Sequence, residues 1–244
     1  MCKTFEGKAI LITGGTSGIG LALAEAFIHR GASMAVCARS RTALESFRKA
    51  HPQALAIEAD VTDLAAHSAM LEAVADRFGK LDILVNNAGR MINRDFTSEV
   101  QEPEGLADEI TLNLTAPIQL TAATLARWPS LDAIVLVSSG YALVSPRRAP
   151  TYGAAKAGLH AFADGLRRQF AGRGTHVLEV LPPAVDTPAT VHSTAKKITP
   201  ADVAAATLDA LEKRRPMALV GKTRLLPAML RLAPKTTQRM VSEM

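Results

Sequence analysis

Residues 8–20 read KAILITGGTSGIG. The apolar run 8–12 predicts a short buried strand, and residues 21–30 show the apolar period of a helix. The turn between them, 13–20, is rich in glycine, which lets the backbone approach a ligand closely. A helix that begins after such a turn offers free N–H groups and its positive dipole end to an anion. Although the spacing is T-G-x-x-x-G-I-G rather than G-x-G-x-x-G, the stretch predicts a site for the pyrophosphate of a dinucleotide.

The alternation of apolar runs and helical segments continues along the chain. Apolar runs without polar alternation are typical of parallel strands that are covered on both faces. Further strands are expected at 34–38, 55–59, 81–85, 133–137, 176–181 and 217–220. Helices are expected at 42–50, 64–78, 106–128, 151–170 and 200–213. The pattern predicts one α/β domain over residues 1–244, a doubly wound Rossmann fold with a seven-stranded parallel sheet flanked by helices.

A second informative stretch, 138–156, reads SSGYALVSPRRAPTYGAAK. Ser139 lies just past the most apolar predicted strand, and parallel sheets bind their ligands at the carboxyl ends of strands. Tyr152 and Lys156 are four residues apart and share one face of a predicted helix. An ammonium about 4 Å from a phenol stabilises the phenolate by about 4 kcal/mol at an effective dielectric near 20. Tyr152 is therefore the expected acid or base, whereas Tyr141 has no lysine four residues later.

Three motifs, in this order, resemble those of the short-chain dehydrogenase/reductase family. They are TGxxxGIG at 13–20, NNAG at 86–89 and S-x12-Y-x3-K at 139–156. The resemblance covers residues 5–187, and the combination is much more specific than any one motif. It implies hydride transfer between a nicotinamide cofactor and a carbonyl or secondary alcohol. The alternative is a catalytically silent NAD(P)-binding protein with regulatory or scaffolding work, because a fold alone does not establish turnover.

The resemblance also implies a role for each of four residues. Tyr152 gives or takes the proton, and Ser139 hydrogen-bonds and positions the substrate oxygen. Lys156 lowers the pKa of Tyr152 and binds the nicotinamide ribose. Asn113, inside the predicted helix 106–128, bends that helix and supports a proton relay to the lysine. The alternative for Asn113 is an ordinary polar helix residue, although asparagine is locally unfavourable in a helix.

The residue after the second predicted strand bears on the choice of cofactor. An acidic residue there bonds the ribose hydroxyls of NAD(H), whereas a basic residue accommodates the 2′-phosphate of NADP(H). The chain has Arg39 at this place and no acid, so NADP(H) is favoured over NAD(H). The alternative is that Arg39 and Arg41 only cap or solvate the next helix.

The strand ends and the resemblance together give a set of expected cofactor contacts. The alternative role for Asp60 or Thr62 is that of the N-cap of helix 64–78. Pro183 replaces the family's usual glycine and lacks an N–H, so we expect different hydrogen bonding near the nicotinamide. The double proline resembles a subgroup related to the D-alanine-transfer accessory oxidoreductases. The expected contacts are Thr13, Gly14, Thr16, Ser17, Gly18, Ile19, Arg39, Asp60, Val61, Asn87, Ala88, Gly89, Tyr152, Lys156, Pro182, Val185 and Thr187.

The sequence is least informative about the substrate side. In the resembling enzymes the segment at 188–197 covers the substrate; here it is short and polar, and His192 is its one candidate contact. The tail 222–244 is basic and carries leucine and methionine. We expect it to pack at a subunit interface, with a lid as the second reading. A membrane-surface helix is third, because Pro227 and Pro234 interrupt the helical period.

Composition narrows the remaining classes of partner. The formal net charge is +5, but the basic residues are scattered and no nucleic-acid-binding signature occurs, so we expect no nucleic-acid partner. No apolar run has the length of a membrane span. Cys2 and Cys37 lack a C-x-x-C partner, and no histidine pair has metal-ligand spacing. We expect a cytoplasmic homodimer or homotetramer without a metal, acting on a small-molecule carbonyl or alcohol.

Overall fold

The computed structural model describes residues 4–191 and 195–243, so Cys2 and His192 lie outside the described residues. The strands are β1 (Ala9–Thr13), β2 (Ser33–Ala38), β3 (Leu55–Glu58), β4 (Ile83–Asn86), β5 (Ala133–Val137), β6 (His176–Leu181) and β7 (Met217–Leu219). The α-helices are α1 (Gly18–His29), α2 (Arg41–Ala50), α3 (Leu64–Phe78), α4 (Pro103–Ile110), α5 (Ala116–Arg127), α6 (Pro150–Gln169), α7 (Pro200–Glu212), α8 (Leu226–Leu232) and α9 (Pro234–Ser242). A π-helix, Thr111–Thr115, joins α4 to α5, and short 3₁₀ turns lie at Gly140–Ala142, Pro188–Thr190 and Gly221–Leu225.

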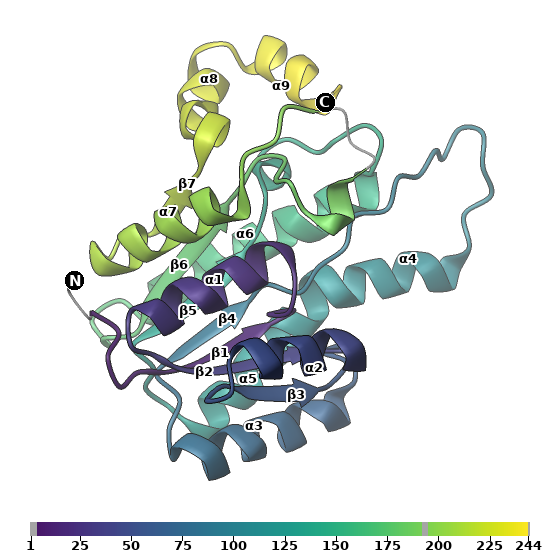
Figure 1. Cartoon of the computed structure of the whole chain (residues 1–244). Helices are drawn as coiled ribbons and strands as arrows, with labels where there is room; N and C mark the ends of the chain where they lie inside the picture. The colour runs from purple at the N-terminus through teal and green to yellow at the C-terminus, as the bar shows by residue number, and fades with distance from the viewer. Residues whose placement is uncertain (1–3, 192–194, 244) are drawn as a thin grey trace.

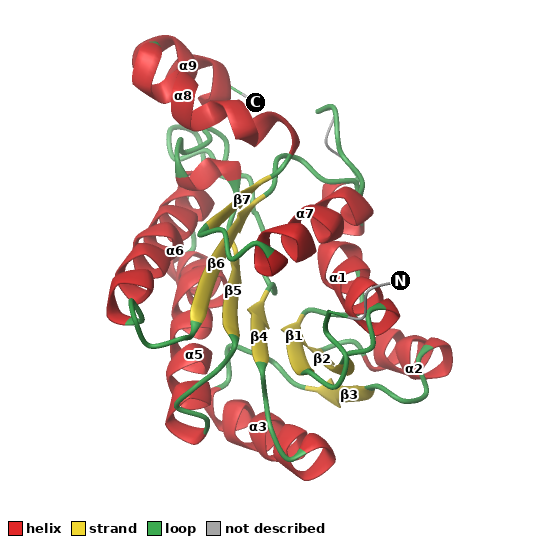
Figure 2. Ribbon diagram, turned by 90° about the vertical axis from the view of Figure 1, so that its left-hand side faces the viewer, coloured by secondary structure: helices red, strands yellow, loops and turns green. Residues whose placement is uncertain are grey.

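The seven strands form one parallel sheet in the order β3-β2-β1-β4-β5-β6-β7. Helices cover both faces, with α1, α2 and α7 on one side and α3, α5 and α6 on the other (Figures 1 and 2). The predicted doubly wound Rossmann fold with a seven-stranded parallel sheet is therefore confirmed. The strand order reverses between β1 and β4, and such sheets bind ligands beyond the carboxyl ends of the strands at this switch point.

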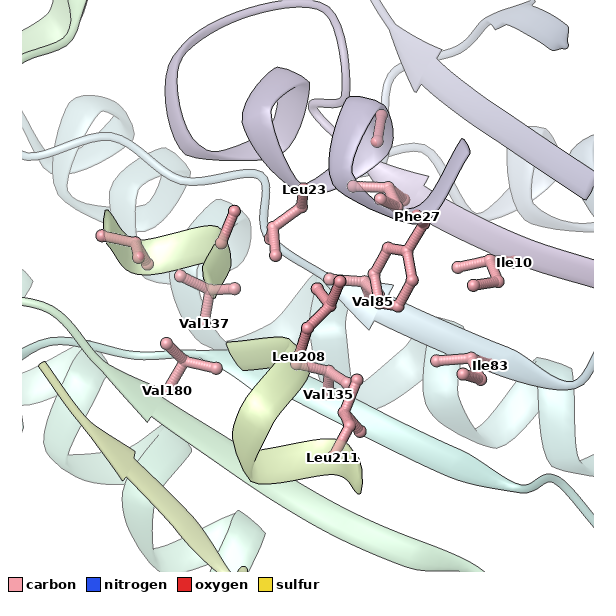
Figure 3. Packing of buried hydrophobic residues seen from close by; sticks show 14 of the residues in the cluster. Ile10, Leu23, Phe27, Ile83, Val85, Val135, Val137, Val180, Leu208 and Leu211 are labelled. Carbon is pink, nitrogen blue, oxygen red and sulfur yellow. The ribbon is translucent and has the colours of Figure 1, made fainter. Parts of the chain in front are cut away.

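The core lies in two apolar layers, one on each face of the sheet. On the α1 face, Leu23 and Phe27 of α1 meet Leu208 and Leu211 of α7 over the central strands (Figure 3). Each such side chain contributes about 1.5–3 kcal/mol when it is fully buried. All five residues of β5 are buried, as the unbroken apolar run predicted. These layers fix the strand ends that carry the site.

Two expectations about helix ends have different outcomes, and the N-cap role of Asp60 or Thr62 is wrong. The N-cap of α3 is Asp63, whose carboxylate accepts a hydrogen bond from a first-turn N–H at 2.9 Å, whereas Asp60 accepts from Thr62. The predicted interruption of the tail at Pro227 and Pro234 is confirmed, because each lies in the first turn of a separate short helix, α8 or α9. A first-turn N–H has no partner within the helix, so proline fits there. The tail is therefore two short helices.

Candidate active site

The glycine turn connects β1 to α1 at the switch point of the sheet. Gly14 and Gly18 have φ angles of +65° and +52°, which residues with a Cβ rarely adopt. A Cβ on Gly15 would lie 2.5 Å from Val36 Cγ1, and a Cβ on Gly20 would overlap the carbonyl oxygen of Gly14. The backbone of the turn and the start of α1 can pack this closely only because these residues are glycine.

The start of α1 has the features of an anion site. Its N-cap, Ser17, makes no side-chain cap hydrogen bond, and the first turn contains no acidic residue. The positive end of the helix is therefore not neutralised by its own cap or by a first-turn carboxylate. Thr16, Ser17, Gly18 and Ile19 all retain exposed surface here. These residues fit the pyrophosphate of a dinucleotide.

Thr13 connects the glycine turn to the turn that follows β4 by hydrogen bonds. Its hydroxyl accepts hydrogen bonds from the N–H groups of Asn87 at 2.9 Å and Ala88 at 3.0 Å. The Asn87 amide in turn donates to the carbonyl oxygens of Thr13 at 2.8 Å and Gly14 at 3.3 Å. Thr13 and Asn87 thus hold the two ligand-facing turns at a fixed spacing, which is a structural role for both side chains.

The residues expected at the adenosine end lie at the carboxyl ends of β2 and β3. Arg39 is exposed, and its guanidinium is 3.4 Å from Asp60 Oδ2. Burial opposes ionisation of Asp60, but hydrogen bonds from Thr62 and the charge of Arg39 hold its pKa below the usual range. Val61 is buried in the apolar layer on the α3 face. Arg41 pairs instead with Glu58 at 2.9 Å, so Arg39 is the basic side chain nearest this end of β2.

Ser139, Tyr152 and Lys156 come together at the end of β5, as expected. Ser139 is the second residue past the buried strand β5, and its hydroxyl accepts a hydrogen bond from the N–H of Tyr141 at 3.1 Å. The Tyr141 and Tyr152 rings meet edge to face with centroids 6.5 Å apart. Lys156 Nζ lies 5.7 Å from the centre of the Tyr152 ring and donates to the carbonyl oxygen of Val137 at 3.0 Å.

The electrostatics of this group differ from the sequence expectation. Burial raises the pKa of Tyr152 to about 12, and a hydrogen-bonding interaction with Ser139 acts the other way without cancelling it. Burial also lowers the pKa of Lys156 to about 8. The ammonium of Lys156 is directed at the Val137 carbonyl, so burial dominates the pKa of Tyr152 in this arrangement, and the lowering of that pKa by Lys156 stays a prediction.

Asn113 lies in the π-helix and is completely buried. Its amide Nδ2 donates to the carbonyl oxygens of Arg90 at 2.7 Å and Glu109 at 2.9 Å, and its Oδ1 accepts from the N–H of Arg90 at 3.2 Å. The expected disturbance of the long helix is thus a π-helical segment, a feature that occurs often at functional sites. Asn113 ties this segment to the chain that follows β4.

The carboxyl end of β6 contributes the remaining expected contacts. Pro182 accepts a hydrogen bond from the N–H of Gly140 at 3.0 Å, which joins the ends of β5 and β6. Val185 is buried and forms an isolated bridge to Ile198. Thr187 approaches the glycine turn, since a Cβ on Gly18 would lie 3.0 Å from its Cγ2. The structure therefore brings Thr187 to the ligand-facing turn and places the Val185 side chain in the core.

Sequence reasoning misses two features beside this site. The first is a buried ion pair between Glu109 and Arg94, whose only sequence signal is a glutamate one turn before Asn113. The second is a groove with a volume of about 510 Å³ between the segment after Tyr141 and the tail helix α9. Its lining residues are Leu143, Val144, Ser145, Lys235, Gln238, Arg239 and Ser242.

The described residues contain neither a membrane-spanning helix nor a cluster of metal ligands. In residues 4–191 and 195–243, no helix has both the length and the apolar character needed to cross a bilayer. Over the same residues, no group of three histidine, cysteine, aspartate or glutamate side chains is arranged to hold a metal ion. Cys37 is a buried free thiol.

Comparison with known proteins assigns the family. The sequence model of the short chain dehydrogenase family matches residues 8–198. The uncharacterized oxidoreductase DltE of Bacillus subtilis (strain 168) is 37% identical over 183 residues, which cover 74% of this chain and 72% of that protein. The 3-oxoacyl-[acyl-carrier-protein] reductase FabG of Escherichia coli (strain K12) is 35% identical over 188 residues, which cover 75% of each chain.

A solved structure shares the fold over almost the whole length. It is a short chain dehydrogenase from Burkholderia cenocepacia J2315 in complex with NADP, with a TM-score of 0.85 and 24% identity over 97% of this chain and 98% of that one. The resemblance read from the motifs is confirmed, and the similarity to DltE agrees with the subgroup suggested by the double proline. Matches of this extent show that the chain belongs to the short-chain dehydrogenase/reductase family of NAD(P)-dependent oxidoreductases.

Proposed function

We propose that this enzyme transfers a hydride between NADP(H) and the carbonyl or secondary alcohol of a small molecule, with Tyr152 as general acid/base. The observation that supports this most is the grouping of Ser139, Tyr152 and Lys156 at the end of β5, on the ligand-binding edge of the sheet. When bound, the nicotinamide supplies or accepts the hydride. The chain supplies binding, orientation and the proton.

In the reducing direction, Ser139 donates a hydrogen bond to the substrate carbonyl oxygen and fixes its position. Tyr152 donates its proton to the same oxygen as negative charge develops there. With a pKa near 12, the phenol is protonated at neutral pH and is ready to act as the acid. Lys156, with its cation close to the ring, stabilises the phenolate that remains.

Replacing the proposed acid tests the mechanism. Tyr152→Phe removes only the hydroxyl, so turnover should fall by about 10²–10⁴-fold while NADPH affinity stays within about twofold. Turnover is followed by the absorbance of the reduced nicotinamide across a panel of ketones, aldehydes and alcohols, and affinity by NADPH fluorescence. Tyr141→Phe is the matched control, because it removes the neighbouring hydroxyl. Equal turnover of Tyr152→Phe and wild type would exclude the role of Tyr152, and a wild type inactive on the whole panel would favour the silent-binding alternative.

The preference for NADP(H) is proposed from Arg39. Its exposed guanidinium at the end of β2 is suited to a 2′-phosphate, and Asp60 is its weak partner at 3.4 Å. We expect Arg39→Ala to weaken NADPH binding about tenfold, the worth of one charge-assisted hydrogen bond, and to leave NADH binding within about twofold. Arg41→Ala, which breaks the pair with Glu58, is the control. Equal affinity of the wild type for NADPH and NADH in fluorescence titrations would contradict this preference.

We propose further that the enzyme is a cytoplasmic homo-oligomer, a dimer or tetramer, without a nucleic-acid partner. The outer face of α6 supports an association of helices, because Ala154, Ala157, Ala161 and Gly165 are small and exposed there. Light scattering on the purified protein gives the oligomeric state. A monomer at micromolar concentration would contradict this part of the proposal.

A further inference from the structure

The segment that follows β4 begins with residues of the proposed site and then crosses to α4 (Figure 1). A single buried carboxylate fixes the first part of this segment by hydrogen bonds. Glu109, on α4, has no exposed surface. Its Oε1 accepts from the N–H of Ile92 at 2.9 Å, and its Oε2 accepts from Arg94 Nε at 3.2 Å.

Arg94 also fixes the end of the segment that leads into α4. Its side chain is only 10% exposed. Besides Glu109, the guanidinium donates to the carbonyl oxygen of Gly105 at 2.7 Å and to Gln101 Oε1 at 3.4 Å. The backbone N–H of Arg94 also donates to the carbonyl oxygen of Arg148, two residues before α6, at 2.8 Å. One ion pair therefore joins both ends of the segment to α4 and lies beside the chain that leads to Tyr152.

The contacts of Glu109 continue directly into those of Asn113. Glu109 holds residue 92, and Asn113, on the next turn, holds Arg90 by both its N–H and its carbonyl group. The intervening backbone passes close to the catalytic lysine, because a Cβ on Gly89 would lie 2.7 Å from Asn113 Oδ1 and 3.5 Å from Lys156 Nζ. A shift of residues 90–92 would therefore change the surroundings of Lys156.

The energetics argue for a role beyond stability. Removing two charges from water costs several kcal/mol per ion, and an apolar pair of similar volume is often at least as stable. A buried pair is useful where one geometry must be fixed, and here the fixed element is the strand-end segment beside Lys156.

We propose that Glu109, acting through Arg94, is a positioning residue for catalysis: it fixes residues 89–94 so that Gly89 and Asn113 keep Lys156 in its place. The test of this proposal by turnover rests on the proposed function, whereas the test by hydrogen exchange of the backbone does not. Glu109→Gln keeps the shape of the side chain and removes its charge. Because this variant leaves Arg94 buried without a counter-ion, the double variant Glu109→Gln/Arg94→Met provides a second test in which both charges are gone. Glu104→Gln, an exposed glutamate of α4, is the matched control.

Four quantities are measured on each full-length variant. They are hydrogen exchange of residues 89–94, NADPH affinity, kcat with KM on an active carbonyl from the panel, and the deuterium isotope effect on kcat with NADPH labelled at the transferred hydride. We expect at least about tenfold faster exchange in residues 89–94, a fall in kcat of about 10–100-fold and a larger isotope effect, because misplacement by about 1 Å slows the chemical step. NADPH affinity should change less than about threefold. Glu104→Gln should match the wild type.

The outcomes separate positioning from folding and from the proposed function. A merely structural role would lower the amount of active enzyme and leave KM and the isotope effect unchanged, which would overturn the proposal. Unchanged exchange in both Glu109 variants, or faster exchange with unchanged kcat, would also overturn it. If the wild type shows no turnover, or Tyr152→Phe retains it, the proposed function fails, and exchange of residues 89–94 still decides whether Glu109 holds the segment.

Discussion

At the scale of single residues, Lys156 shows how burial and chemistry are coupled. Its side chain is 4% exposed and its Nζ has the carbonyl oxygen of Val137 as a partner at 3.0 Å. Burial is the main cause of its lowered pKa, about 8, and the negative charge of Glu179 acts in the opposite direction. An ammonium that has lost most of its water is held ready to stabilise an anion such as the Tyr152 phenolate.

This shift predicts how stability depends on pH. Below pH 8, Lys156 is charged in both the folded and the unfolded chain; between about pH 8 and its ordinary value of 10.5, only the unfolded chain keeps the proton. The unfolded state then binds more protons, so this residue makes the free energy of unfolding rise with pH, by about 3 kcal/mol at most over the window. Lys156→Met should remove that rise.

The measurement is urea unfolding of the cofactor-free protein from pH 8 to 9. The window stops at 9 because Cys37, whose pKa burial raises from 9.0 to about 12, makes stability fall with pH above that point, and Tyr152 does the same above pH 10. Lys49→Met, which changes an exposed lysine of α2, is the control and should keep the wild-type slope. Equal slopes for wild type and Lys156→Met would show that Lys156 keeps its ordinary pKa in the fold.

At the scale of elements, the sequence carries the signals that are local. The strand, glycine turn and helix of residues 8–30 and the apolar run of β5 follow from neighbouring residues, and both are confirmed. The apolar residues Leu159, Phe162, Leu166 and Phe170 recur at helical spacing along α6, and the structure places Leu159 and Leu166 in the core. The site residues at the strand ends could be predicted because a parallel sheet places all its carboxyl ends along one edge.

Elements whose form depends on distant contacts could not be predicted in the same way. Asn113 signals an irregular helix, but the π-helical form needs Arg90, which comes from a different part of the fold, as its partner. Glu109 and Arg94 are ordinary surface-type residues in sequence and become a buried pair only when the segment folds back on α4. The direction of the Tyr152 pKa shift depends on burial, which residue spacing does not report.

At the scale of the whole molecule, the tail is a separate small unit packed on the segment that carries Tyr141. α8 and α9 bury Leu226 and Val241 against Val144, next to Tyr141. The N–H of Arg147 donates to the carbonyl oxygen of Ser242 at 2.9 Å. This packing places the tail against the segment between Ser139 and Tyr152. A lid over the substrate site, the second alternative for the tail, would need such a position. The exposed Leu225 and Leu232, at 65% and 83% exposure, leave an apolar surface that suits the subunit interface.

Removing residues 226–244 should therefore weaken the catalytic end without unfolding the sheet. Leu226 and Val241 each contribute about 1.5–3 kcal/mol by burial, part of which is offset by the cost of ordering the helices. At about 2–4 °C per kcal/mol for a chain of this size, Tm should fall by about 3–10 °C, with the far-ultraviolet dichroism of the Rossmann core retained. Turnover should fall as well, because Val144 and Tyr141 lose their support. Thr236→Ala, at an exposed position of α9 in the same tail, should keep the wild-type Tm and turnover. A truncated enzyme with unchanged Tm and turnover would mean that α8 and α9 do not pack on the catalytic end in solution.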